Sequence, residues 1–349
     1  MMLMVLACVL LVEIVMGRME FAWRLVPRSA LGMQFDIEEK VIQPNPHPKV
    51  LVMGTSRANG AFLPTVIEES LGLQRGEVLN LAIGEQLPFD MLWIYERNRE
   101  RLSRASLVFL QVDPFQFSVR QMGLARFRKF ASWSERLAFS GRTRMQLISD
   151  YFLQANTALP LFYLYFGSWA IFGRAPQSPG LDRYGRLALE AIADDHDERE
   201  FRDVQLRSWI EWFYTDYKYS PVFEQHFSRI IKLVKEDGGE VVIIVMPMAA
   251  DFPRFVREAI GDEYDRFRAR MLQLASEADV HCLLWEDPRK AGLVFRDFRD
   301  WGHLNTPGAE KWSRFISQWV LAERQKNTLK WKQSDPVQRT GSREPESIP

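Results

Sequence analysis

Five short apolar runs, rich in β-branched residues, constrain the fold of this 349-residue chain more than any other feature. Each run is bounded by turn residues, which is typical of strands that are buried on both faces of a parallel sheet. Amphipathic segments lie between most of the runs, and alternating strands and helices predict right-handed crossovers with helices on both faces. The expected strands cover residues 50–53, 78–83, 107–112, 240–246 and 280–285, and the expected helices cover residues 64–71, 88–102, 222–235, 253–275 and 307–322.

The predicted fold class is therefore α/β, with a three-layer α/β/α architecture in which a five-stranded parallel sheet is the middle layer. The gap between residues 112 and 240 is too long for a single crossover, so we expect a helical insertion between strands three and four. We place this insertion at about residues 119–219 of an α/β domain that spans residues 48–322. The length of the chain alone would allow about two domains. It is equally consistent with one domain that is interrupted by an insertion.

Residues 151–173, within the expected insertion, carry no charged side chain. The stretch is long enough for a second transmembrane span, and it could also form an apolar surface that lies on a bilayer. Gln154, Asn156 and Ser168 interrupt it, which favours a buried helical hairpin or a lid over the sheet.

The first sixteen residues contain one charged side chain and are followed by Arg18, Arg24 and Arg28. A membrane anchor over residues 1–23, a cleaved signal peptide and a buried helix are the three interpretations. The segment lacks the basic start and the small-residue cleavage site of a signal peptide, and its length and apolarity favour the anchor. Because the arginines follow the segment, the positive-inside rule would place the rest of the chain in the cytoplasm. We expect that a basic leader upstream of Met1 reverses this orientation.

Composition excludes several classes of function. The 45 Lys and Arg balance 45 Asp and Glu, so a nucleic-acid partner is not expected, because such proteins usually carry a basic excess. Cys8 and Cys282 are the only cysteines, and no histidine has metal-ligand spacing, so we expect no disulfide framework and no metal. Phosphate-loop and dinucleotide motifs are also missing, so no cofactor is expected. Residues 326–349 are polar and rich in charge, which predicts a disordered tail.

A serine, a histidine and an aspartate fall where a parallel α/β sheet binds its ligands. Such sheets bind ligands at the carboxyl ends of their strands. Residues 54–57 (Gly-Thr-Ser-Arg) follow the first expected strand, and residues 300–303 (Asp-Trp-Gly-His) precede the last expected helix. Ser56, His303 and Asp300 therefore match a nucleophile, its general base and the group that orients the base.

Each of these residues also has an ordinary structural interpretation. Ser56 alone is a common turn residue, and His303 alone could precede a helix that Asn305 caps. Arg57 could bind an anionic substrate group or form a structural salt bridge. Trp301 could stack on a sugar ring or pack its own loop. The joint placement of serine, histidine and aspartate favours an active site.

These motifs resemble the SGNH/GDSL hydrolase superfamily, whose flavodoxin-like fold the predicted sheet would share. The resemblance rests on residues 54–56, on the glycine that ends residues 80–84, and on Asp300-x-x-His303. The chain is most similar to the membrane-anchored bacterial branch, which includes alginate O-acetylation proteins and the D-alanyl transfer protein of teichoic acid synthesis. The resemblance covers residues 48–322 and does not account for the insertion.

The resemblance implies that Ser56 is the nucleophile, His303 its general base and Asp300 the orienting carboxylate. It implies an oxyanion hole formed by the backbone N–H groups of Ser56 and Gly84. Two blocks depart from the family pattern. Thr55 replaces the usual Asp of the first block, and residues 110–113 (Leu-Gln-Val-Asp) replace Gly-x-Asn-Asp, whose Asn donates to the oxyanion. Gln111 is the candidate replacement for that amide donor.

The implied function is a membrane-anchored, extracytoplasmic acyl esterase or O-acyltransferase, with acetyl as the expected group and a cell-surface or secreted polysaccharide as the substrate. Arg57 and Trp301 are candidate substrate-binding residues, and a membrane acyltransferase is a candidate partner. The alternative is an inactive SGNH-like binding or scaffold protein of a polysaccharide modification or export complex. A cytoplasmic α/β protein with a buried first helix is the third hypothesis.

Overall fold

The computed structural model contains one five-stranded parallel sheet with the strand order β2-β1-β3-β4-β5. It describes residues 32–118, 127, 130–138, 206–249 and 252–330, together with single positions 4, 20, 24 and 145. The predicted α/β fold class is confirmed. The strands are β1 (Val50–Met53), β2 (Val78–Asn80), β3 (Leu107–Gln111), β4 (Glu240–Val245) and β5 (His281–Leu284).

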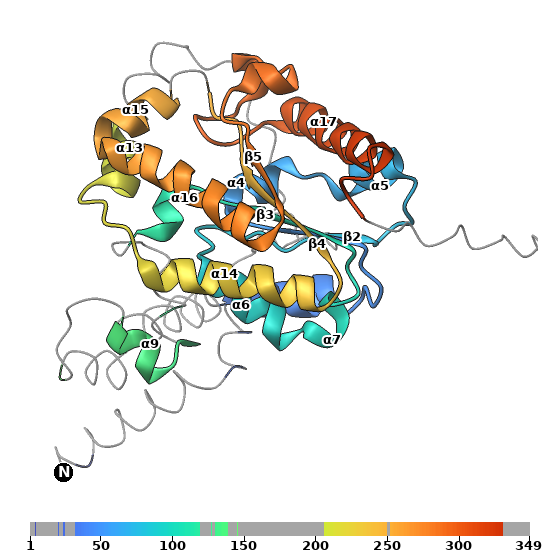
Figure 1. Ribbon diagram of the computed structural model, residues 1–349, viewed down its shortest axis with the longest axis horizontal. Coiled ribbons are helices and arrows are strands. Elements are labelled where there is room, and N and C mark those ends of the chain that lie inside the picture. Colours follow the sequence, from blue (N-terminus) through green and yellow to red (C-terminus); the bar gives the residue numbers. More distant parts are fainter. Residues whose placement is uncertain are drawn as a thin grey trace, which may run out of the picture.

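Helices cover both faces of this sheet (Figure 1). One face carries α3 (Gly32–Ile37), the π-helix η1 (Glu38–Ile42), α6 (Pro88–Arg97), α7 (Arg99–Leu102), α14 (Pro221–Glu236) and most of α16 (Asp262–Ala278). The other face carries α4 (Ser56–Ala61), α5 (Pro64–Leu71), α13 (Leu206–Tyr214), α15 (Phe252–Ile260) and α17 (Thr306–Gln325). The remaining short elements are α9 (Trp133–Ala138) and the 3₁₀ helices η2 (Pro114–Phe117), η4 (Pro288–Ala291) and η5 (Phe295–Asp297).

The strands divide their side chains between two core layers. In β1, Leu51 and Met53 belong to one layer, and Val50 and Val52 belong to the other. All four side chains are buried, because successive residues of a strand point to opposite faces and each face is covered by helices. This explains why the strands are continuous apolar runs rather than alternating ones.

Two expected helices are broken in the structure. Residues 88–102 form α6 and α7, which separate at Asn98, where φ is −113° and ψ is 20°. Residues 253–275 fall in α15 and α16, which separate at Gly261 with a φ of +55°. That backbone conformation favours glycine, and apolar periodicity does not detect it. The short helix α4, which begins at Ser56, was not expected from the sequence.

The two ends of the expected insertion meet beside α14. Ser118 and Tyr219 form an isolated antiparallel bridge, and the N–H of Ser220 donates to the carbonyl oxygen of Phe117 at 2.6 Å. The rings of Phe117 and Tyr219 stack with centroids 5.8 Å apart. The uncharged stretch at residues 151–173 lies outside the described residues, so its three interpretations remain predictions.

The predicted membrane localisation is corrected. Within the described part of the chain, no helix is both long and apolar enough to cross a bilayer. The single-pass anchor assigned to residues 1–23 falls almost entirely outside the described residues. The first residues of the expected disordered tail are ordered, because Leu329 is buried in the core and the Thr328 side chain bonds to Glu323. The rest of that expected tail, residues 331–349, lies outside the described residues.

Candidate active site

Ser56 is the first residue of α4, at the carboxyl end of β1. Thr55 caps this helix, and its Oγ1 accepts the N–H of Arg57 at 3.3 Å. A Thr in this position satisfies a backbone donor that the helix leaves without a partner. Because strand order reverses between β1 and β3, the cap places the Ser56 hydroxyl at the switch point where open parallel sheets bind ligands.

His303 and Asp300 complete a hydrogen-bonded chain with Ser56. Ser56 Oγ lies 2.8 Å from His303 Nε2 although the two residues are 247 positions apart. His303 Nδ1 lies 2.8 Å from each oxygen of the Asp300 carboxylate. When the Nδ1 proton is donated to Asp300, Nε2 is free to accept the Ser56 proton. The three residues therefore have the geometry of a nucleophile, a general base and an orienting carboxylate.

Asp300 remains ionised because its loop supplies several donors. The backbone N–H groups of Gly302 and His303 donate to Asp300 Oδ1 at 3.0 and 2.8 Å. Burial raises the pKa of this carboxyl, but His303 and the two N–H groups more than offset burial, so the pKa lies below the usual 3.8. An anionic Asp300 can stabilise the imidazolium that forms when His303 takes the serine proton.

Arg57 is buried, so its predicted substrate-binding role is corrected. Its side chain is 4% exposed and forms a buried ion pair with Asp113. Nε donates to the carbonyl oxygen of Gly302, and Nη2 donates to those of Met246 and Pro247. The guanidinium thus joins the ends of three strands to the loop of His303.

Gln111 is also buried and its amide bonds to other interior groups, so its predicted role as an oxyanion donor is corrected. Its Oε1 accepts the N–H and the hydroxyl of Thr55 at 2.7 and 3.0 Å, and its Nε2 donates to Asp113 at 2.7 Å. A Cβ on Gly54 would lie 2.5 Å from Gln111 Oε1, so only glycine allows this close approach. Gln111 holds the turn before Ser56.

The loop of Gly84 lies next to this turn. The N–H of Ile83 donates to the carbonyl oxygen of Gly54 at 3.1 Å, and the N–H of Gly54 donates to Gln86 Oε1 at 2.7 Å. Gly84 lies between these two anchor points, beside the backbone that leads to Ser56. The oxyanion hole assigned to the N–H groups of Ser56 and Gly84 remains a prediction.

The aromatic residue beside the triad is Trp209, which the sequence did not indicate. Its ring lies edge-to-face with the His303 ring, with centroids 5.5 Å apart. Trp212, one turn along α13, is 60% exposed. The predicted stacking role of Trp301 is corrected because this side chain is 1% exposed and packs near Phe295 within its own loop.

A buried polar network supports the site. The Gln116 side chain accepts the N–H of Asp113 at 2.6 Å and donates to the carbonyl oxygen of Gln86 at 2.6 Å. The spacing Asp113-x-x-Gln116 is that of a capping box and could have indicated the local turn. No sequence signal links Gln86 to either residue. Among the described residues, no group of three His, Cys, Asp or Glu is placed to hold a metal ion.

No protein-family model matches this chain, and no curated protein matches it. Solved structures match it over most of its length. A lipase/acylhydrolase from Enterococcus faecalis has a TM-score of 0.38 and 10% identity, over 82% of this chain and 100% of that chain. The acetyl xylan esterase AlAXEase has a TM-score of 0.37 and 12% identity, over 78% of this chain and 98% of that chain. Similarity at this level does not assign a family.

Proposed function

We propose that the chain is an SGNH-like serine esterase or O-acyltransferase that works through an acyl-enzyme on Ser56. The observation that carries this proposal is the continuous hydrogen-bonded chain from Ser56 Oγ through His303 to the Asp300 carboxylate. The backbone N–H groups of Gly302 and His303 hold the Asp300 carboxylate in place, and this carboxylate orients the His303 ring. A serine in this setting is an activated nucleophile.

The proposed reaction has two steps. Ser56 Oγ attacks the ester carbonyl carbon while its proton passes to His303 Nε2, and the C–O bond to the leaving alcohol breaks as His303 gives that proton to the leaving oxygen. Water or a saccharide hydroxyl then attacks the acyl carbon while His303 takes its proton. The bond from the acyl carbon to Ser56 Oγ breaks as His303 gives that proton to Ser56 Oγ. Water as acceptor gives an esterase, and a saccharide hydroxyl gives a transferase.

We propose a polysaccharide as the acyl-bearing or accepting substrate. Trp212 supports this choice, because it is an exposed aromatic side chain on the helix that contacts His303 through Trp209. An aromatic ring can cover the apolar C–H surface of a sugar ring and remove it from water. Acetyl remains the proposed acyl group.

Hydrolysis of p-nitrophenyl acetate by the full chain tests the triad. We expect Ser56→Ala and His303→Ala each to lower kcat/KM by about a thousandfold or more. Ser106→Ala and His281→Ala are matched controls, because both residues lie at the amino ends of their strands, on the opposite edge of the sheet. Equal turnover by the wild type and the triad variants would refute the proposal.

The second candidate is an inactive binding or scaffold protein of a polysaccharide modification or export complex. It is favoured by Gln111, whose buried amide holds the turn and so leaves the expected third oxyanion donor unreplaced. The 2.8 Å contact between Ser56 and His303 argues against it. Saturable binding of an acetylated oligosaccharide without turnover above the Ser56→Ala background would support this second candidate.

A further inference from the structure

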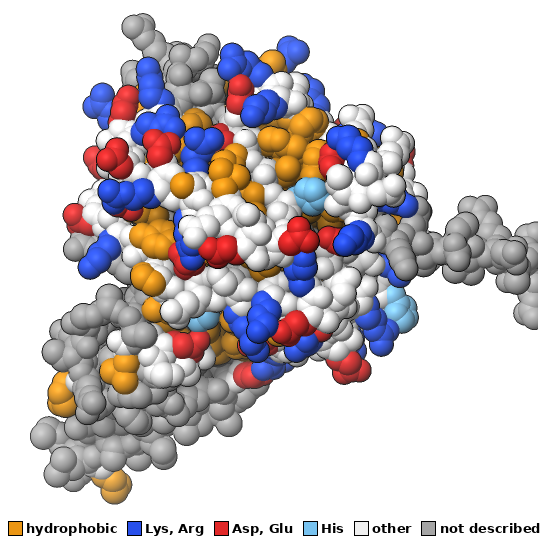
Figure 2. Space-filling model, viewed as in Figure 1, with side chains coloured by type: hydrophobic (Ala, Val, Ile, Leu, Met, Phe, Trp, Pro, Cys, Tyr) orange, Lys and Arg blue, Asp and Glu red, His pale blue; other side chains and the backbone are white. Residues whose placement is uncertain are grey.

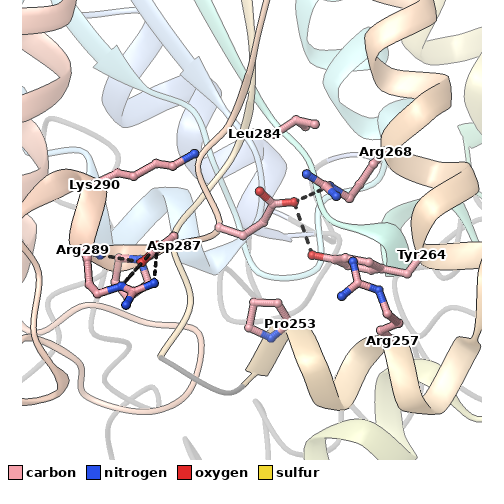
Figure 3. A pocket seen from close by; sticks show the side chains of 10 residues that line it. Pro253, Arg257, Tyr264, Arg268, Leu284, Asp287, Arg289 and Lys290 are labelled. Carbon is pink, nitrogen blue, oxygen red and sulfur yellow. Dashed lines mark hydrogen bonds and ion pairs between the residues drawn. The ribbon is translucent and has the colours of Figure 1, made fainter.

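A hollow of about 620 Å³ lies at the carboxyl end of β5 (Figure 3), and its lining does not include Ser56, His303 or Asp300. Ligand sites commonly have volumes of about 300–1,000 Å³. The walls come from the loop after β5, from the start of α15 and from the first half of α16. Its charged lining residues are Arg257, Arg268, Glu286, Asp287, Arg289 and Lys290.

Both carboxylates of the lining already have a cation. Arg268 Nε lies 2.8 Å from Glu286, and Tyr264 also donates to this carboxylate, at 3.4 Å. Arg289 holds Asp287 with two parallel bonds, from Nε at 3.0 Å and from Nη2 at 2.8 Å. These pairs satisfy both carboxylates of the hollow, and two further cations of the lining pair with neither of them.

The two remaining cations are Arg257 and Lys290. Arg257 lies over the ring of Tyr264 at 5.2 Å and bonds to Asp265, which is not part of the lining. Lys290 is exposed, and no described residue lies within ion-pair distance of its ammonium group. It is close enough to Asp287 to help Arg289 hold the pKa of that carboxyl below its usual value. Its charge is therefore available to a ligand.

The charge of this hollow differs from that of the wider surface. Figure 2 shows Lys and Arg interspersed with Asp and Glu over the face in view, which agrees with a net charge of zero for the chain. A local excess of cations inside a concave site attracts anions more strongly than the same charges on an open surface.

The hollow is connected to the triad loop through the segment after β4. The N–H of Met248 donates to the carbonyl oxygen of Glu286 at 3.2 Å, and the N–H of Ala249 donates to that of Trp301 at 2.9 Å. Trp301 lies between Asp300 and His303 in sequence. One short segment therefore bonds both to the loop that lines the hollow and to the triad loop.

We propose that this hollow binds a carboxylate or phosphate group of the substrate, with Lys290 as its cationic ligand. The link to the substrate rests on the proposed function, whereas binding of the anion does not. Guanidinium and ammonium groups bind both anions through charge-assisted hydrogen bonds. Lys290 forms no ion pair with a described residue, so its ammonium group can neutralise the bound anion.

Calorimetry on the full-length Ser56→Ala variant, which cannot turn over an ester, tests the site with glucuronate, inorganic phosphate and neutral glucose. We expect saturable binding of at least one anion, no binding of glucose, and weaker binding at high salt. Adding Lys290→Gln should weaken anion binding about tenfold. Binding of glucuronate alone identifies a carboxylate, and binding of phosphate alone identifies a phosphate.

Lys330→Gln is the matched control. Lys330 follows Thr328, whose carbonyl oxygen contacts His281 at the amino end of β5, so it lies at the opposite edge of the sheet. We expect this variant to bind anions as the parent does. No saturable anion binding, equal binding of glucose, or no effect of Lys290→Gln would overturn the proposal. If the wild type still hydrolyses p-nitrophenyl acetate in that case, only the hollow fails; anion binding without hydrolysis would instead refute the proposed function alone.

Discussion

Arg57 donates a hydrogen bond from Nε to the carbonyl oxygen of Gly302 at 2.9 Å. This bond joins the residue after Ser56 to the residue before His303. The ion-pair partner of Arg57 is Asp113, which is buried. Burial raises the pKa of the Asp113 carboxyl, although Arg57 and Gln111 favour its charged form. The relative position of Ser56 and His303 therefore depends on an ion pair in the interior.

Removal of this guanidinium should destabilise the fold. In Arg57→Met, Asp113 loses its buried cation, and we expect the free energy of unfolding to fall by about 3 kcal/mol or more. The loss should shrink as pH falls, because a protonated Asp113 needs no cation. Urea denaturation at several pH values measures both effects. Arg289→Met, which breaks an exposed pair with Asp287, is the control and should change stability little; an unchanged midpoint for Arg57→Met would contradict the structural role.

Gly54 should not tolerate a side chain. A Cβ there would lie 2.5 Å from Oε1 and 2.7 Å from Cβ of Gln111, which is fully buried. We expect Gly54→Ala to cost about 1–3 kcal/mol of stability and to lower esterase activity, because Gln111 holds the N–H of Thr55. Thermal unfolding and p-nitrophenyl acetate turnover measure the two effects. For stability, Gly84→Ala is the control, because its Cβ would meet nothing within 4 Å.

The sheet and the juxtaposition of Ser56, His303 and Asp300 could be predicted from the sequence because local patterns encode them. Apolar runs mark strands such as β1, and parallel strands bring their carboxyl ends to one edge, which places Ser56 near His303. The roles of Arg57, Gln111 and Trp301 could not be predicted in this way. Each role depends on burial by residues far away in the chain, and a polar side chain after a strand looks the same in sequence whether it faces substrate or core.

Asp300→Asn should nearly abolish activity without unfolding the chain. An amide cannot stabilise the imidazolium of His303, and it can hold the ring in the wrong tautomer. We expect kcat/KM for p-nitrophenyl acetate to fall about a thousandfold or more, with a circular dichroism spectrum like that of the wild type. Retention of more than about a tenth of the activity would remove Asp300 from the mechanism.

The same variant should change how stability depends on pH. Because the pKa of Asp300 is lowered in the folded state, ionised Asp300 contributes stability above its unfolded pKa, and this contribution is lost as pH falls through the lower folded pKa. The wild type should therefore lose stability relative to Asp300→Asn below the usual value of 3.8. Urea midpoints of both proteins across this acidic range test the sign, and parallel curves would show that Asp300 is not stabilised in its charged form.

Trp209 should position the His303 ring. The two rings meet edge-to-face with centroids 5.5 Å apart, and Phe213 supports Trp209 at 4.9 Å. We expect Trp209→Ala to lower kcat for p-nitrophenyl acetate about tenfold, because a loosened imidazole spends less time in line with Ser56. Trp209→Phe keeps an aromatic edge and should recover most of that loss.

A matched control for Trp209 exists at the other end of the sheet. Trp319 makes the same kind of contact with His281, with ring centroids 5.5 Å apart, but His281 lies at the amino end of β5. Trp319→Ala should therefore leave kcat unchanged, once protein concentrations are corrected for the folded fraction. If Trp209→Ala and Trp319→Ala lower kcat equally, or if Trp209→Phe fails to recover activity, the contact with His303 contributes only to packing and does not position the base.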